Sequence, residues 1–144
     1  MVVTYEKVDC KEKEEAIIRA VQKTNEIQSA IDLLESGTDS ISVSSEGKTY
    51  LCKINSIYYI ESVDKKNFVY TKDNCYETKM RLYELEDKLG PYYARCSKAM
   101  IVNLKKVKNV NSEIGARMIA TLLNGEEIVI SRSYVKDIKR RLDI

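Results

Sequence analysis

Two hydrophobic periods divide the chain into two parts. Between residues 9 and 37, the side chains of one stripe recur at spacings of three and four, namely Ile17, Ala20, Thr24, Ile27, Ile31 and Leu34. This spacing predicts one amphipathic helix that begins after Asp9 as its N-cap and ends at Ser36-Gly37. Residues 2–8 predict a short strand before the helix. The helix either packs on the rest of the chain or forms a dimer contact.

From Ile41 onward the period is two, which predicts a series of short strands. Two strands are expected around Glu46-Gly47, and Asn124-Gly125 predicts a hairpin with a type I′ turn. Helices are expected at residues 79–89, before Gly90-Pro91, and at residues 133–142. The remaining predicted strands occupy residues 55–62, 67–71, 75–79, 92–96, 99–104, 116–123 and 126–131. This order predicts a mostly β fold, either a small barrel or layered sheets.

The composition makes an enzyme the poorer interpretation. The chain has no His, one Pro and five Gly, so histidine bases, histidine metal ligands and Gly-rich phosphate loops are excluded. Cys10, Cys52, Cys75 and Cys96 form no CxxC pair, which argues against a zinc site. We interpret them as small, mostly buried apolar residues of a reduced cytoplasmic protein. We therefore expect no catalytic residue, no metal and no cofactor.

Charge is unevenly distributed along the chain. Residues 1–39 hold five Lys/Arg and nine Asp/Glu, residues 40–94 hold eight of each, and residues 95–144 hold eleven Lys/Arg and five Asp/Glu. A basic third beside an acidic N-terminal segment is typical of a protein that binds nucleic acid or another acidic surface. An ordinary solvated surface is the alternative.

Three short polar segments interrupt the predicted strands, at residues 64–67 (Asp-Lys-Lys-Asn), 95–98 (Arg-Cys-Ser-Lys) and 131–134 (Ser-Arg-Ser-Tyr). Each places Lys or Arg beside a short amide or hydroxyl, a mixture that contacts phosphate oxygens and base edges. Any one of them could be a solvated loop, but the three together favour DNA or RNA binding. Arg132 and Lys136, at the start of the last helix, gain nothing from the helix dipole and are better functional candidates than the arginines at its end.

Ordered blocks of the sequence resemble the LytTR family of bacterial DNA-binding domains. They are YIES at residues 59–62, R-x-x-x-x-x-IVN at residues 95–103, and NGE…SR-x-Y…K at residues 124–136. The match runs from about Ile41 to Leu142. The resemblance implies LytTR-like layered β-sheets of about ten strands, with an N-terminal strand-helix extension, one inserted helix and a C-terminal helix. It also implies that inter-strand loops enter successive major grooves of bent, double-stranded DNA that carries repeated half-sites.

The three polar segments match the DNA-contacting loops of the family. Asn67 falls near a base-contacting position, and Arg132 falls on a base-contacting arginine. In the second loop Ser97 replaces a frequent His, so we expect Lys98 to act there as a phosphate clamp. Asn103 is expected to satisfy a strand end rather than to touch DNA. The expected DNA-binding residues are Lys65, Lys66, Asn67, Arg95, Ser97, Lys98, Arg132, Tyr134 and Lys136.

These expectations define a domain organisation and a set of partners. Residues 1–39 would form the extension, a candidate dimerisation element, and residues 40–144 the DNA-binding domain. No receiver domain is expected, so the chain resembles the stand-alone LytTR transcription regulators of the bacterial cytoplasm. Its expected partners are double-stranded DNA, a second copy of the chain and an inhibitory membrane protein, with no small-molecule substrate. The alternative function is a protein-interaction module that acts through the N-terminal helix.

Overall fold

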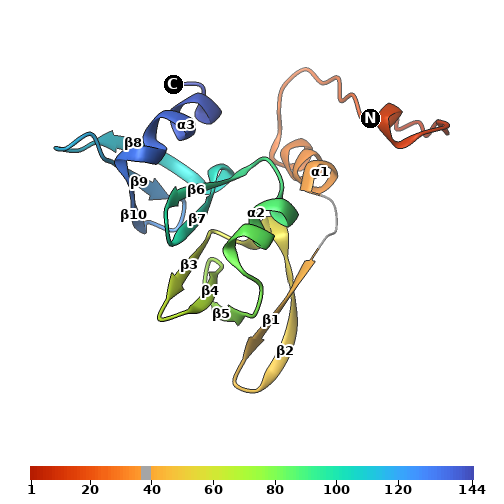
Figure 1. Ribbon diagram of the computed structural model, residues 1–144. Coiled ribbons are helices and arrows are strands. Elements are labelled where there is room, and N and C mark those ends of the chain that lie inside the picture. Colours follow the sequence, from red (N-terminus) through yellow and green to blue (C-terminus); the bar gives the residue numbers. More distant parts are fainter. Residues whose placement is uncertain (37–39) are drawn as a thin grey trace. The chain divides into compact units, whose positions relative to one another are not determined.

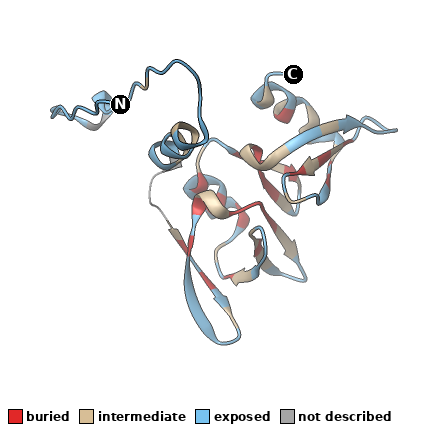
Figure 2. Cartoon of the chain, turned by 180° about the vertical axis from the view of Figure 1, so that it is seen from behind, coloured by how far each residue is buried: buried red, intermediate tan, exposed pale blue. Residues whose placement is uncertain are grey.

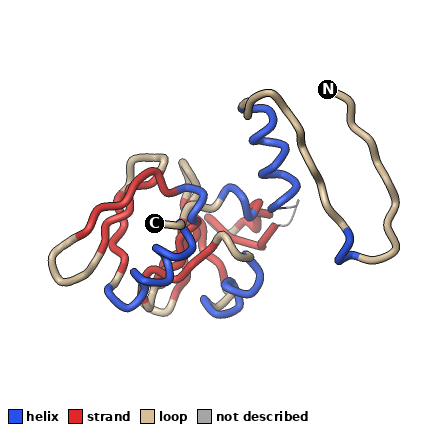
Figure 3. Tube along the Cα trace, turned by 90° about the horizontal axis from the view of Figure 1, so that it is seen from above, coloured by secondary structure: helices blue, strands red, loops and turns tan. Residues whose placement is uncertain are grey.

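The computed structural model describes residues 1–36 and 40–144. The chain divides into two units, Met1–Gly37 and Thr38–Ile144. In the first unit, a 3-10 turn at Lys11–Lys13 is followed by residues 14–24, which run without regular structure to the helix α1 (Asn25–Ser36). Figure 3 shows this segment as a loop next to α1.

The helix of the first unit begins later than the stripe predicted. The hydroxyl of Thr24 accepts a hydrogen bond from the backbone N–H of Ile27 at 3.2 Å, so Thr24 caps α1. A β-branched Thr followed by Asn favours a helix start over a helix interior, because both side chains compete for backbone hydrogen bonds. The first half of the predicted stripe is exposed, with Ile17 at 68%. Residues 2–8 form no strand, and Asp9 pairs with Lys13 at 2.9 Å instead of capping a helix. The predicted end at Gly37 lies outside the described residues.

A seven-stranded antiparallel sheet forms most of the second unit (Figure 1). Its strands lie in the order β2-β1-β5-β4-β3-β7-β6. The helix α2 (Leu82–Leu89) follows β5, begins three residues later than predicted, and packs Leu82, Leu85 and Leu89 into the core. The strands are β1 (Ser40–Ser45), β2 (Lys48–Lys53), β3 (Tyr59–Val63), β4 (Lys66–Tyr70), β5 (Cys75–Thr78), β6 (Tyr93–Ser97) and β7 (Met100–Asn103).

A three-stranded sheet and the last helix complete the unit. The sheet has the order β10-β9-β8, with β8 at Val107–Ser112, β9 at Met118–Leu122 and β10 at Glu127–Ile130. The helix α3 (Arg132–Leu142) follows directly. The sequence pattern did not predict β8, because most of its side chains are polar and exposed, as in an edge strand. Tyr59 Oη donates to a carboxylate oxygen of Glu126 at 2.7 Å and so connects the two sheets.

Alternation along β3, β6 and β7 builds two cores on opposite faces of the larger sheet. Ile60, Tyr93 and Ile101 face the core shared with α2. Their neighbours face the core shared with β9, β10 and α3, as a strand of period two requires. Figure 2 shows buried residues along these strands and on α2 and the last helix. The central strands are therefore covered on both sides, which fixes the loops at their ends.

The hairpin turns differ from the prediction in one respect. Glu46-Gly47 and Asp64-Lys65 each have two consecutive residues with positive φ, the signature of a type I′ turn. At Asn124-Gly125 only the glycine has positive φ, so the predicted type I′ turn is wrong there. The Asn124 side chain instead accepts a hydrogen bond from the backbone N–H of Glu126 at 3.1 Å, which favours a wider Asx turn.

Candidate nucleic-acid interface

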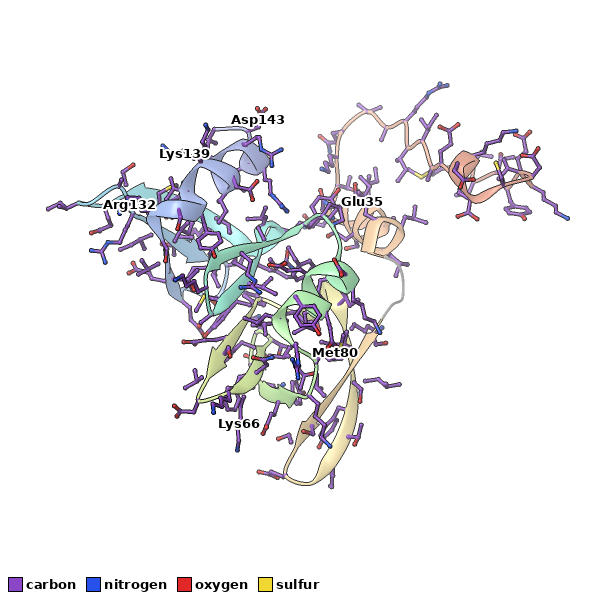
Figure 4. All side chains as sticks on the ribbon, in the orientation of Figure 1. Glu35, Lys66, Met80, Arg132, Lys139 and Asp143 are labelled. Atoms are coloured by element: carbon purple, nitrogen blue, oxygen red, sulfur yellow. The ribbon has the colours of Figure 1, made fainter. Side chains whose placement is uncertain are left out.

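Two backbone hydrogen bonds bring the three polar loops to one edge of the second unit. The N–H of Ser62, near the end of β3, donates to the carbonyl of Ala99 in the β6–β7 turn at 2.7 Å. The N–H of Ser131, just before α3, donates to the carbonyl of Cys96 on β6 at 2.8 Å. The β3–β4 turn, the β6–β7 turn and the start of α3 therefore lie in succession. Figure 4 labels Lys66 and Arg132, in the first and third of these loops.

The first loop holds its cations on a strained turn. Asp64 and Lys65 have φ values of 51° and 65°, a left-handed conformation that L-residues avoid. Lys65 and Lys66 are exposed. Asn67 is half-buried, and its side-chain N–H donates to the carbonyl of Met80 at 2.6 Å. The two lysines therefore face solvent, whereas the Asn67 amide nitrogen has an internal partner.

The second loop is held by Arg95. Its guanidinium donates to the carbonyl of Lys98 at 2.8 Å, and its Nε lies 2.5 Å from a carboxylate oxygen of Glu86 on α2. The Nε–carboxylate pair has ion-pair distance without hydrogen-bond alignment, so Nε has no hydrogen-bond partner within the described residues. Ser97 Oγ accepts from the N–H of Ala99 at 3.2 Å. Lys98 alone among the predicted residues of this loop has an exposed side chain.

The third loop leads into α3, whose first residues include cations at the end of a helix where acidic side chains are favoured. Ser131 is at the N-cap position but makes no side-chain capping bond, and the first turn contains no Asp or Glu. Arg132 and Lys136 are exposed on α3, whereas Tyr134 is half-buried against the second core. Positive charge at the positive end of the helix dipole is unfavourable unless an anion binds nearby.

Five of the predicted residues form an unpaired cationic group along this edge. None of them has an ion-pair partner in residues 1–36 or 40–144. Like charges on one edge repel each other, so their arrangement favours an anionic partner. The five residues are Lys65, Lys66, Lys98, Arg132 and Lys136.

Asn103 has the structural role that the sequence predicted. It is 2% exposed, and its Nδ2 donates to the carbonyl of Ile57 at 2.9 Å and to Tyr93 Oη at 3.1 Å. Its Oδ1 accepts from the N–H of Lys105 at 3.0 Å and so caps the 3-10 turn at Leu104–Lys106. This side chain ends β7 and cannot reach a ligand.

The cysteines are less uniformly buried than predicted. Cys52 and Cys96 are buried, but Cys10 and Cys75 are exposed, so the interpretation of four mostly buried residues is wrong for two. Burial raises the pKa of the thiol of Cys96, which lies within the second loop on β6, to about 12. At neutral pH this group is an apolar core side chain and not a nucleophile.

Comparison with known proteins assigns the chain to a family. The model of the LytTr DNA-binding domain matches residues 47–143. The chain belongs to the LytTR family. The LytTr DNA-binding domain solved from Bacillus cereus has a TM-score of 0.71 at 23% identity, over 75% of this chain and 100% of that one. The predicted LytTR fold, mostly β with ten strands, an inserted helix and a C-terminal helix, is confirmed.

The LytTR relatives carry regulatory names. Transcriptional regulatory protein YpdB of Escherichia coli (strain K12) is 31% identical over 108 residues, which cover 74% of this chain and 44% of YpdB. Transcriptional regulatory protein LytR of Staphylococcus aureus (strain N315) is 28% identical over 127 residues, 88% of this chain and 52% of LytR. The chain spans about half the length of these curated relatives. Among the described residues, no helix is long and apolar enough to cross a membrane.

Proposed function

We propose that this chain is a cytoplasmic transcription regulator that binds double-stranded DNA through the three loops, without catalysis. The observation that carries the proposal is the row of five exposed, unpaired cations along one edge of a LytTR domain. Two backbone hydrogen bonds hold the loops in that row. Since the loops project from strand ends, they can enter the major groove of a DNA with repeated half-sites.

We assign different roles to the residues of the edge. Arg132 reads a base, best a guanine, which contributes about 1–3 kcal/mol of discrimination. Lys65, Lys66, Lys98 and Lys136 bind phosphates. The remaining predicted residues have internal partners and position the loops: Asn67, Arg95, Ser97 and Tyr134.

The test is selection of binding sites from a randomised duplex pool, followed by two variants. Arg132→Ala should lose the preference for the selected site over a scrambled duplex. Lys98→Ala should weaken both duplexes alike, because a phosphate contact carries no sequence information. Failure to enrich any duplex would contradict the function, and selective loss with Lys98→Ala would contradict the assigned roles.

We propose further that two copies bind together through the first unit. No described side chain of residues 1–36 is buried, and its large apolar side chains Val2, Val3, Tyr5, Ile17 and Val21 are strongly exposed. If each of these five side chains buries about 100 Å², the ten in a dimer would together bury about 1,000 Å² of surface. That area is near the lower limit of a specific interface. Sedimentation should show a dimer that Val3→Asp with Tyr5→Asp converts to monomers. An inhibitory membrane protein partner stays a prediction.

The alternative function, a protein-interaction module, is favoured by Leu33 and Leu34, which are exposed on α1. Truncation at Ser40 separates the two functions. Specific DNA binding that survives the truncation supports the regulator. No specific DNA binding by the full chain, together with loss of a protein partner on truncation, supports the interaction module.

A further inference from the structure

A fourth segment lies at the same edge as the three loops. Residues 79–81 follow β5, and Asn67 on β4 pairs with Thr78 at the end of that strand. The Asn67 side chain then bonds to the carbonyl of Met80 at 2.6 Å, and the N–H of Met80 donates to Thr78 Oγ1 at 3.3 Å. These bonds hold the segment beside the start of β4. Figure 4 labels Met80 on this segment and Lys66 on its neighbour.

This segment presents two more cations. Lys79 and Arg81 are exposed, and neither has an ion-pair partner in the described parts of the chain. With Lys65 and Lys66 they make four cations close to a single acid, Asp64, in residues 64–67 and 79–81. The half-buried amide of Asn67 fixes the backbone that carries Lys79 and Arg81, which a scattered pair of solvated surface residues would not require. The concentration of charge points to an anion.

Arg81 repeats the feature seen at Arg132. It lies at the N-cap position of α2 and makes no side-chain capping bond. The first turn of α2 contains Glu84, which suits the positive end of the helix dipole, so Arg81 is notable for its position at the edge and not for an unfavourable dipole. Each helix that begins at this edge therefore has an arginine at its start: Arg81 is the N-cap residue of α2, and Arg132 directly follows Ser131, the N-cap residue of α3.

The sheet order sets how far the fourth segment lies from the second loop. From β5 to β6 the order is β5-β4-β3-β7-β6, and neighbouring strands are about 4.8 Å apart. The row therefore extends about 19 Å before α3 is reached, which exceeds the major-groove width of about 12 Å. One groove therefore cannot hold the whole row, and if the first loop enters a major groove, the fourth segment beside it lies over the sugar-phosphate backbone that borders that groove.

We propose that Lys79 and Arg81 bind DNA backbone phosphates that flank the groove entered by the first loop, with Asn67 as their positioning residue. The inference rests on the proposed function, and it adds a contact outside the three loops that is independent of sequence. A duplex of mixed sequence is therefore a sufficient probe.

The experiment measures the salt dependence of affinity with the full chain. A fluorescein-labelled duplex of mixed sequence, about 40 base pairs long, is titrated between about 50 and 300 mM KCl. Lys79→Gln with Arg81→Gln should reduce the steepness of the log–log salt slope by about 1.8, at about 0.9 per phosphate. The matched control is Lys48→Gln with Lys72→Gln, which removes the same charge from exposed turns at the opposite end of the strands. Its slope should equal that of the unmodified chain.

Two results would overturn the inference, and they differ. If the unmodified chain binds and the Lys79/Arg81 variant has the same log–log salt slope, the fourth contact does not exist. The proposed DNA binding by the three loops is unaffected by that result. If the unmodified chain shows no salt-dependent binding at all, the proposed function fails as well. Thermal unfolding of each variant, which should match that of the unmodified chain, separates lost contacts from lost structure.

Discussion

Replacing Lys65 by glycine is predicted to stabilise the fold and weaken DNA binding at the same time. Lys65 has φ of 65° in the β3–β4 turn, and its side chain is exposed at the edge that we assign to DNA. A left-handed lysine costs free energy that glycine would not, because glycine has no Cβ. Backbone strain of this kind tends to occur at functional sites, which fits a lysine that binds DNA at this position.

The expected gain in stability is small but measurable. Relief of the left-handed conformation contributes about 1–2 kcal/mol. The greater freedom of glycine in the unfolded chain offsets about 0.4–1 kcal/mol of this. The free energy of unfolding should therefore rise by about 0.5–1 kcal/mol, which raises Tm by about 2–4 °C for a domain of this size.

The expected loss in binding follows from one missing phosphate contact. The log–log salt slope should become shallower by about 0.9, which corresponds to about fivefold weaker binding at 0.15 M salt. Thermal unfolding and fluorescence anisotropy on a labelled duplex measure the two effects on one protein sample. Because stability should rise while DNA affinity falls, the prediction is stricter than a prediction of either effect alone.

Two control variants separate strain from charge. Glu46→Gly acts on the matched turn of the β1–β2 hairpin, where φ is 51°, at the opposite end of the strands. It should raise Tm to a similar extent and leave the salt slope unchanged. Lys65→Ala should weaken binding without the gain in Tm. If Lys65→Gly lowers Tm, or binds DNA as well as the unmodified chain, the reasoning about this turn is refuted.

Three further predictions concern the interior. Asn103→Ala should lower the free energy of unfolding by about 2–4 kcal/mol in urea titrations, because it leaves buried backbone groups unpaired; a loss below about 1 kcal/mol would contradict this. Because burial raises the pKa of Cys96 from 9.0 to about 12, the unfolded state ionises first, so stability should fall between about pH 9 and 12. That fall should be smaller in Cys96→Ala, and equal pH profiles would exclude the explanation. Maleimide should label Cys10 and Cys75 in the folded protein and the other two thiols only after unfolding, as followed by mass spectrometry.

Local patterns in the sequence predicted what depends on neighbouring residues. The period of two from Ile41 onward, the turn at Glu46-Gly47 and the stop at Gly90-Pro91 are properties of short segments, and the strands and helices of the second unit follow them. The first unit shows where this fails: residues 14–24 have a helical pattern, but a short helix needs a packing partner, and the described structure buries none of their side chains. The type I′ prediction at Asn124 failed because its side chain bonds to the backbone instead.

The three loops that we assign to DNA binding were visible in the sequence as polar segments with cations, but their common edge was not. Residues 64–67, 95–98 and 131–134 are far apart along the chain, and only the pairing of β3 with β7 and the bond from Ser131 to Cys96 bring them together. The same tertiary contacts separated the exposed lysines from Asn67 and Arg95, which have internal partners. The pairing of β4 with β5 and the bond from Asn67 to Met80 brought Lys79 and Arg81 to the edge. The sequence by itself determined which segments could bind an anion, and the tertiary structure decided which side chains remain free to do so, because pairing and burial depend on residues distant in the chain.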